Sequence, residues 1–311
     1  MSNRQPRILL SGANGQLGWE LKRTLSSQYE VHDFERSKLD LTDSNQIRQR
    51  VREIKPDIII NAAAYTAVDK AEEESELAFA VNAEAPAILA EEAARIDAAL
   101  IHYSTDYVFD GSGDQPWREE DRPAPLNVYG ESKLAGEQAI KASGVAHLIF
   151  RTSWVYGTHG HNFVKTILRL AAEKDQMNII DDQIGAPTSA AFLANTSAQI
   201  LNQLTDNPKK GIAENSGTYH LCCSGETSWH GFASEIVRLA EQNDIHLALK
   251  TIHRIPTSAY PTPAQRPKNS RLDCTQLNNV FGIQPITWQT ALAQALPHII
   301  ASQTEATTKP T

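Results

Sequence analysis

Excess positive charge and long apolar runs are both missing from this sequence. Its 29 Lys and Arg residues are outnumbered by 37 Asp and Glu, which gives a formal net charge of -8. Nucleic-acid phosphates select a basic surface, so this balance argues against a nucleic-acid partner. No apolar run approaches the ~20 residues of a membrane span, and the first residues, Met1 to Pro6, are polar. We therefore expect neither membrane insertion nor secretion.

Cysteine is also scarce. The chain has three, Cys222, Cys223 and Cys274, an odd number without the spacing of a metal site. The simplest interpretation is reduced, structural thiols in a cytoplasmic protein, with the adjacent pair on opposite faces of a strand. Hydrophobic residues make up 41% of the 311, which is enough for one large or two medium domains.

What the sequence does contain is an alternation of apolar, strand-like runs with helical patterns. This alternation is typical of an α/β fold with a Rossmann-like, doubly wound parallel sheet, which binds its ligand at the carboxyl ends of the strands. We expect strands at 7–11, 29–33, 57–61, 99–104 and 147–152, and helices at 15–25, 44–54, 70–95 and 129–142.

The first expected strand leads into a glycine-rich loop. Gly12, Gly15 and Gly18 are spaced Gly-x-x-Gly-x-x-Gly, and a helix is expected from Gly15 onward. Glycine permits a tight turn and the close approach of a pyrophosphate, and a helix N-terminus offers its amides to the anion. A plain turn is the alternative. The strand before the loop and the helix after it favour a dinucleotide site.

We therefore expect a dinucleotide-binding domain at 1–153 and a smaller C-terminal substrate domain at 154–302. After about Trp154 the pattern loosens into proline-rich loops, with expected helices at 163–174, 189–204, 228–243 and 288–302. Residues 303–311 are small and polar, and we expect them to form a disordered tail.

Tyr129 and Lys133 stand four residues apart in one expected helix, which places them on the same face. A phenol with a pKa near ~10 is a poor acid or base at neutral pH, and a lysine one turn away favours the phenolate. We expect Lys133 to lower the pKa of Tyr129 toward the working range of an acid catalyst. A solvated helix face remains the alternative for this spacing alone.

With these motifs the chain resembles the extended short-chain dehydrogenase/reductase superfamily and, within it, the dTDP-4-dehydrorhamnose reductase family. The resemblance extends from about residue 8 to about residue 290. It is carried by the runs GQLGWEL (15–21), NAAAYTAVDKAE (61–72), YSTDYVFDG (103–111), PLNVYG (125–130), RTSWVY (151–156), DQIGAPT (182–188) and RPKNSRL (266–272).

The resemblance implies a nicotinamide dinucleotide as cofactor. After the second strand, Arg36 favours the 2'-phosphate of NADPH, whereas Asp33 or Glu35 would suit NADH. We expect NADPH to be preferred, and both NADH use and a plain surface role for Arg36 stay open. The implied cofactor-binding residues are Gly12, Gly15, Gln16, Leu17, Arg36, Asp40, Leu41, Ala63, Ala64, Tyr65, Tyr129 and Lys133.

The resemblance also implies Thr105, Tyr129 and Lys133 as a catalytic triad that reduces the C4 keto group of dTDP-4-dehydro-L-rhamnose to give dTDP-L-rhamnose for cell-surface polysaccharide. Tyr129 would protonate the developing alkoxide, Thr105 would orient it, and Lys133 would bind the nicotinamide ribose. Position 107 is a tyrosine where related dehydratases have a glutamate, which favours reduction over elimination. A reductase or epimerase of another nucleotide sugar, and a non-catalytic regulatory subunit, remain alternatives.

Substrate contacts are implied for a further group of residues. Trp154 would face the apolar side of the deoxysugar and Arg266 would suit the diphosphate, although core and surface roles stay open. The superfamily also implies that the C-terminal α/β substrate domain is discontinuous, with segments near 177–180 and 218–222 that return to the main sheet as strands. The implied substrate-binding residues are Thr105, Asp106, Tyr129, Trp154, Asn162, Gln183 and Arg266.

The resemblance bears on assembly as well. Some family members dimerise through a magnesium ion held by glutamates, and only part of that set is present here. Glu20 remains, but 189–191 read Ser-Ala-Ala and 288–300 contain no glutamate. A divalent ion needs several oxygen ligands. We therefore expect an enzyme that needs no metal and is a monomer, with a weak homodimer left open.

Overall fold

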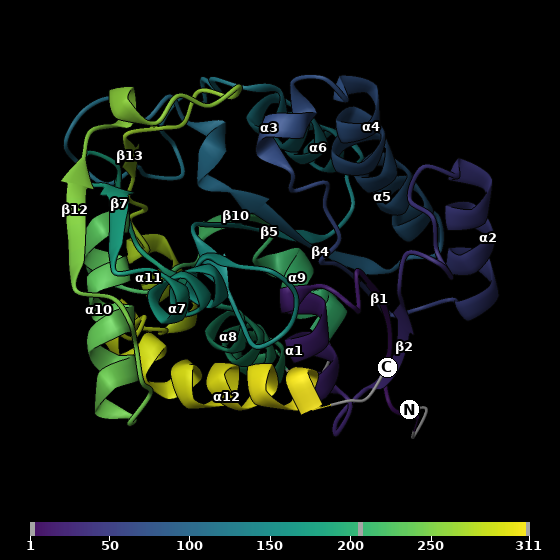
Figure 1. The fold of residues 1–311 in the computed structure, drawn as a ribbon. Helices are drawn as coiled ribbons and strands as arrows, with labels where there is room; N and C mark the ends of the chain where they lie inside the picture. The colour runs from purple at the N-terminus through teal and green to yellow at the C-terminus, as the bar shows by residue number, and fades with distance from the viewer. Residues whose placement is uncertain (1–3, 205–207, 309–311) are drawn as a thin grey trace.

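The structure is a computed structural model that describes residues 4–204 and 208–308, with side chains described only as far as residue 303. Its centre is a six-stranded sheet in the order β10-β5-β4-β3-β1-β2, and every neighbouring pair is parallel (Figure 1). The strands are β1 (Arg7–Ser11), β2 (Glu30–Phe34), β3 (Ile58–Asn61), β4 (Ala99–Thr105), β5 (His147–Thr152) and β10 (Gly217–His220). The doubly wound α/β prediction is confirmed.

Helices cover both faces of this sheet because neighbouring residues of a strand point to opposite faces. Ile8 and Leu10 of β1 join the core beneath α1 (Gln16–Leu25) and α8 (Ala190–Gln203). Leu9 joins the opposite core, beneath α2 (Ser44–Ile54), α5 (Ala85–Arg95) and α6 (Val128–Ala142). Strands buried on both faces read as continuous apolar runs, which is why the sequence pattern identified them.

The helix predicted at 70–95 is instead broken into pieces, so this prediction is wrong. The pieces are α3 (Val68–Ala71), α4 (Ser75–Phe79), a π-helical turn (Ala80–Glu84) and α5. The π-helical turn carries Asn82, which is 1% exposed. Its side chain accepts from the backbone N of Tyr65 at 2.9 Å and donates to Ser132 Oγ at 3.0 Å. These contacts tie the segment to the loop after β3, a constraint that helical periodicity does not express.

The second half has its own core, which is built from α7 (Phe163–Glu173), α10 (Trp229–Gln242) and α12 (Trp288–Thr308). Short strands flank this core in three small sheets. They pair β6 (Val155–Tyr156) with β9 (Thr188–Ser189), β7 (Gln176–Ile180) with β12 (Thr251–Ile255), and β8 (Ile184–Gly185) with both β11 (Thr227–Ser228) and β13 (Asn269–Ser270). The remaining elements are α9 (Pro208–Glu214), α11 (Thr275–Phe281) and 3-10 turns at Asp106–Val108 and Thr257–Ala259.

The two predicted return strands have different outcomes. β10 joins the large sheet beside β5, as predicted for 218–222, although it ends at His220 and so places Cys222 and Cys223 in the following loop. β7 pairs with β12, so the prediction that 177–180 returns to the large sheet is wrong. The sequence of a five-residue strand does not identify the strand that it pairs with, because that pairing is decided by tertiary packing. The division at residue 153 stays a prediction.

The tail predicted to be disordered from residue 303 is instead part of α12 as far as Thr308, and 309–311 lie outside the described residues. A helix that has already formed adds one hydrogen bond for each further residue, and no proline or glycine interrupts the sequence between Pro297 and Pro310. In the described part of the chain, no helix combines the length and apolar character needed to cross a membrane.

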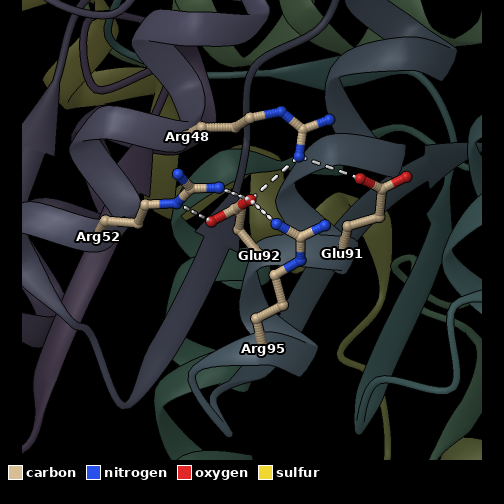
Figure 2. Close-up of polar contacts among 5 residues, drawn as sticks. All are labelled: Arg48, Arg52, Glu91, Glu92 and Arg95. Atoms are coloured by element: carbon tan, nitrogen blue, oxygen red, sulfur yellow. Dashed lines mark hydrogen bonds and ion pairs between the residues drawn. The ribbon is translucent and has the colours of Figure 1, made fainter.

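The packing of α2 on α5 is reinforced by a charged cluster around one carboxylate (Figure 2). Glu92 is fully buried and accepts hydrogen bonds from Arg48, Arg52 and Arg95 at 2.7–3.3 Å. Arg48 also reaches Glu91 at 3.1 Å. These arginines are partly exposed, so they bring charge to a buried acid without being buried themselves.

Candidate active site

Three segments that carry predicted site residues lie at the carboxyl edge of the large sheet. β1, β3 and β4 lie side by side, and their register aligns Ser11 with Asn61 and Asn61 with His102. The glycine loop follows Ser11, the Ala63 to Tyr65 segment follows Asn61, and Thr105 is the last residue of β4. The sequence therefore delivers three functional segments to one edge, as a parallel sheet requires.

The glycine loop is shaped for close backbone approach. Gly12 has φ +77°, and a Cβ there would lie 2.7 Å from the backbone N of Ala63. A Cβ at Gly18 would lie 2.0 Å from the carbonyl oxygen of Gly12, so helix α1 starts directly against the loop. Gly15 caps α1 without a side-chain hydrogen bond, which leaves the first amides of the helix for an anion. The residues present fit a dinucleotide.

Beyond the loop, the end of β2 presents an exposed arginine and two acids that already have partners in the protein. Asp33 pairs with Lys22 at 2.8 Å. Hydrogen bonds from Ser37 and Asn14 lower the pKa of Glu35 and hold its carboxylate. Arg36 is exposed. Hydrogen bonds from Thr42 lower the pKa of Asp40, and Leu41 beside it is buried.

The predicted cofactor residues after β3 are held from two sides. The Ala63 amide donates to Asn61 Oδ1 at 3.3 Å. The Tyr65 hydroxyl donates to Glu74 at 2.6 Å, and this hydrogen bond raises the pKa of Tyr65 to about 12. Ala64 lies between them and is partly exposed. Gln16, the first residue of α1, accepts a hydrogen bond from Asn162 Nδ2 at 3.1 Å.

Thr105 and Tyr129, two of the predicted catalytic residues, lie within hydrogen-bonding distance of each other. Asn127 caps α6 by accepting from the Gly130 amide, and a Cβ at Gly130 would lie 2.2 Å from the carbonyl oxygen of Tyr107. The small residue therefore lets the first turn of α6 lie against the end of β4. Burial raises the pKa of Tyr129 to about 12, and a hydrogen bond with Thr105 acts in the opposite direction.

Lys133 does not act on the phenol as the sequence predicted. Its Nζ donates to the carbonyl oxygen of Tyr103 at 2.7 Å and lies 3.2 Å from His102 Nε2. Lys133 is 1% exposed, and burial lowers its pKa to about 8. The expectation that Lys133 lowers the pKa of Tyr129 is wrong in this structure because the amine is directed toward β4. Burial raises the pKa of Tyr129 by more than the hydrogen bond with Thr105 lowers it.

Asp106 follows Thr105 and is buried beside it. Thr105 Oγ1 donates to Asp106 Oδ1 at 3.1 Å. Burial raises the pKa of Asp106 to about 6, while Ser270 and Thr105 act in the opposite direction. Within the described residues its Oδ2 atom has no hydrogen-bond partner. A buried carboxylate oxygen without a partner is costly to the protein and is suited to accept a hydrogen bond from a ligand hydroxyl.

Trp154 occupies a strained backbone conformation with φ +47°. Its indole ring stacks on Trp229 with centroids 3.6 Å apart, and its edge lies against Gly185, where a Cβ would be 2.7 Å away. Trp229 Nε1 donates to Gln183 Oε1 at 3.1 Å, and Gln183 Nε2 donates to Thr257 at 3.1 Å. One face of Trp154 is therefore already covered by protein, and Gln183 holds the covering ring.

The other two predicted substrate residues also have partners in the protein. Arg266 forms a bidentate pair with Asp69 at 2.7 and 3.0 Å, and it lies close enough to Tyr107 to act on the pKa of that phenol. Tyr107 in turn packs edge-on against Tyr129 with centroids 5.5 Å apart. Asn162 caps α7 and donates to the Gly157 carbonyl oxygen at 2.7 Å.

Three residues of the site were missed by sequence reasoning. His102 and Asn61 are buried polar residues inside otherwise apolar strands, and that contrast was the available signal. Trp229 gave none, since an aromatic residue at the start of a helix is usually part of a core. No group of three or more metal-ligating side chains occurs among the described residues. Glu20 bonds instead to Arg23 and Thr158.

Comparison with known proteins gives the family. A family profile described as "RmlD substrate binding domain" matches residues 6–300. The dTDP-4-dehydrorhamnose reductase of Escherichia coli strain K12 is 45% identical over 300 residues, which cover 95% of this chain and 98% of that protein. The chain belongs to the dTDP-4-dehydrorhamnose reductase family. The resemblance read from the sequence is thus confirmed.

Solved structures of this reductase family agree with the fold. The Bacillus anthracis enzyme, in complex with NADP, is 36% identical with a TM-score of 0.85, covering 94% of this chain and 99% of that one. The Clostridium acetobutylicum protein is 37% identical with a TM-score of 0.86, covering 94% and 98%. UDP-glucose 4-epimerase of Thermus thermophilus, 19% identical with a TM-score of 0.76, shares the fold alone.

Proposed function

We propose that this protein is an NAD(P)H-dependent oxidoreductase that reduces the C4 keto group of dTDP-4-dehydro-L-rhamnose to give dTDP-L-rhamnose, the last step in making this precursor of cell-surface polysaccharide. The observation that carries the proposal is the contact between the buried Thr105 and the half-buried Tyr129, at the same sheet edge as the glycine loop. It occurs in a chain that is 45% identical, over 95% of its length, to a dTDP-4-dehydrorhamnose reductase.

The cofactor side of the proposal is supported by the backbone cradle at Gly12 and the open N-terminus of α1. When bound, the nicotinamide supplies a hydride to the carbonyl carbon. Arg36 is exposed at the end of β2, while Asp33 and Glu35 already have partners, so this end of the site offers charge to a 2'-phosphate. We propose that NADPH is preferred over NADH.

The proton side of the proposal follows from the pKa of Tyr129. A phenol whose pKa is raised to about 12 stays protonated at neutral pH and serves as the acid that a developing alkoxide needs. Thr105 hydrogen-bonds the oxygen of the developing alkoxide as well. This oxygen is thereby fixed between the hydroxyls of Tyr129 and Thr105. Lys133, buried one turn along α6, keeps donors for a ribose hydroxyl.

For the substrate we propose that the free Oδ2 of Asp106 accepts from a sugar hydroxyl and that the face of Trp154 not covered by Trp229 packs on the deoxysugar. Arg266 stands beside Tyr107 and could reach the diphosphate by exchanging part of its pair with Asp69. Gln183 and Asn162 use their amide groups within the protein, so their contribution to substrate binding is to hold Trp229 and Gln16.

We further propose that the protein acts as a cytoplasmic monomer. Cys222, Cys223 and Cys274 are all free, which suits a reducing compartment. Glu20 is 4% exposed and is used within the chain, so it is poorly placed to share an ion with a second copy. Light scattering with and without a chelator tests this. A dimer that dissociates when metal is removed would contradict it.

The experiment that tests the main proposal follows the loss of reduced-nicotinamide absorbance when protein meets enzymatically generated dTDP-4-dehydro-L-rhamnose, with NADPH and NADH compared. Tyr129→Phe should lower kcat by at least ~10²-fold because the acid is lost. Tyr103→Phe is the matched control, since Tyr103 is a buried phenol that bonds Ser197 instead. Near-normal turnover by Tyr129→Phe, or no oxidation with either cofactor, would overturn the proposal.

A further inference from the structure

A chain of buried polar side chains runs from the glycine loop to the catalytic lysine. Ser11 Oγ donates to Asn61 Oδ1 at 2.7 Å, Asn61 Nδ2 lies 3.1 Å from His102 Nδ1, and His102 Nε2 lies 3.2 Å from Lys133 Nζ. Their exposed fractions do not exceed 1%. The proposed reaction gives His102 and Asn61 no role. Burying four polar side chains in a row is nevertheless costly unless each donor in the row faces an acceptor.

The donors and acceptors of this network can be assigned in turn. Asn61 Oδ1 accepts from Ser11 and from the Ala63 amide, so the atom facing His102 is the amide nitrogen, which only donates. His102 Nδ1 must then accept, and the neutral ring carries its proton on Nε2. The Nε2 proton points at Lys133 Nζ, and an ammonium has no lone pair to accept it, whereas a neutral lysine amine has one. This arrangement therefore holds Lys133 as an amine.

The ammonium form of Lys133 requires a second arrangement. His102 Nε2 must accept from Lys133, which places the ring proton on Nδ1 and requires Asn61 to turn its carbonyl oxygen toward the ring. The Ala63 amide then loses Asn61 Oδ1 as its acceptor. The two arrangements differ by one proton, which is exchanged with solvent. Burial and the nearby Lys133 lower the pKa of His102, so the ring is neutral in both.

We propose that His102 and Asn61 are positioning residues that couple the protonation state of Lys133 to the backbone of the dinucleotide site at Ala63. This inference rests on the proposed function, because it takes the cofactor to bind against Gly12 and Ala63. Any ligand that fixes the Ala63 amide changes the affinity of Lys133 for its proton, and by linkage the proton changes the affinity for the ligand.

Few other charges act on Lys133. Besides His102 on β4, the charged group that influences it is Glu137, one turn later on α6. Glu137 is paired with Arg151 on β5 at 2.7 Å and also accepts from Ser104 at 2.6 Å. Lys141 lies 3.9 Å from the same carboxylate. Because Glu137 is already neutralised by Arg151, the partner that can switch is His102.

The test is the pH dependence of NADPH binding to the full-length protein, measured by fluorescence titration from about pH 6 to about pH 10. Affinity should fall as Lys133 loses its proton, with a midpoint near the lysine pKa of about 8. In His102→Gln the side-chain oxygen can accept from the ammonium without Asn61 having to turn, so the proton no longer acts on the Ala63 amide. The change in affinity over this pH range should therefore be smaller than in the wild type.

A second variant and a control keep the outcome clear. In Asn61→Asp one carboxylate accepts from Ser11, the Ala63 amide and the ring together, so the Ala63 amide keeps its acceptor in both states and the change in affinity with pH should again be smaller. Tyr103→Phe alters the neighbouring residue on β4, whose hydroxyl bonds Ser197, and should leave the midpoint unchanged. A wild-type affinity that does not change with pH, or variants whose change in affinity with pH matches that of the wild type, would overturn the proposal. Loss of sugar reduction with this binding profile intact would instead overturn the proposed function.

Discussion

The buried ion pair between Glu137 and Arg151 should be among the most sensitive points of the fold. The Arg151 side chain is 2% exposed and that of Glu137 is fully buried, with Nη2–Oε2 at 2.7 Å and Nε–Oε1 at 2.9 Å. Glu137→Gln leaves the guanidinium charge without a counter-ion and sets an amide NH₂ against an N–H donor. Removing one partner of such a buried pair costs about 3–5 kcal/mol.

The assay is urea unfolding followed by tryptophan fluorescence at neutral pH. With a slope of ~3 kcal/mol/M for a chain of this size, the midpoint of Glu137→Gln should fall by about 1 M or more. The matched control is Glu173→Gln, because the Arg169–Glu173 pair is more than half exposed and its loss should cost less than ~0.5 kcal/mol. The double variant Glu137→Leu with Arg151→Met should be less damaging than Glu137→Gln alone.

A loss below ~1 kcal/mol for Glu137→Gln would refute the reasoning, since it would mean that water reaches Arg151 once the carboxylate is gone. The same result would be expected if the pair were a surface contact. The structure argues otherwise, because the ring of Phe109 lies 5.0 Å from the Arg151 guanidinium.

Three further predictions concern separate parts of the molecule. Glu92→Gln should lower the free energy of unfolding by ~2 kcal/mol in urea titrations, because a buried acid loses charge-assisted bonds to three arginines, while exposed Glu91→Gln should cost less than ~0.5 kcal/mol; equal effects would contradict this. Burial raises the pKa of Asp106 to about 6, so the native state binds more protons than the unfolded chain between about pH 4 and about pH 6, and stability falls as pH rises through that window. Asp106→Asn should remove this fall of ~2–3 kcal/mol, and an unchanged pH dependence of the urea midpoint would exclude it. Arg36→Ala should raise KM for NADPH by about tenfold or more and leave KM for NADH unchanged. Lys38→Ala should have a smaller effect, because Lys38 lies 3.9 Å from Glu35. A parallel rise of KM for both cofactors would show a structural effect instead.

Local patterns carried much of the fold. The predicted bounds of β1, α2 and β5 coincide with those in the structure because their apolar periodicity matches their burial on the sheet. The prediction of one helix at 70–95 failed because Asn82 hydrogen-bonds Tyr65 and Ser132 rather than its neighbours along the chain. The partner of β7 was likewise decided across space.

The candidate site divides in the same way. Residues that a motif spacing records, such as Gly12 and Tyr129, could be named in advance. The sequence could not show that Lys133 bonds His102, 31 residues away, or that Trp154 stacks on Trp229. Those contacts decide which pKa moves and which ring face stays open, and they are fixed only when separate elements meet.

The position of β10 has a consequence for how the chain is made. Its partner β5 ends at Thr152, whereas β10 begins at Gly217, so a nascent chain that has left the ribosome only as far as residue 152 exposes an apolar strand edge with no neighbour. Such an edge is a template for aggregation until the sixth strand arrives. The first half is therefore an incomplete folding unit during synthesis, and a fragment that stops before β10 should need a chaperone or precipitate.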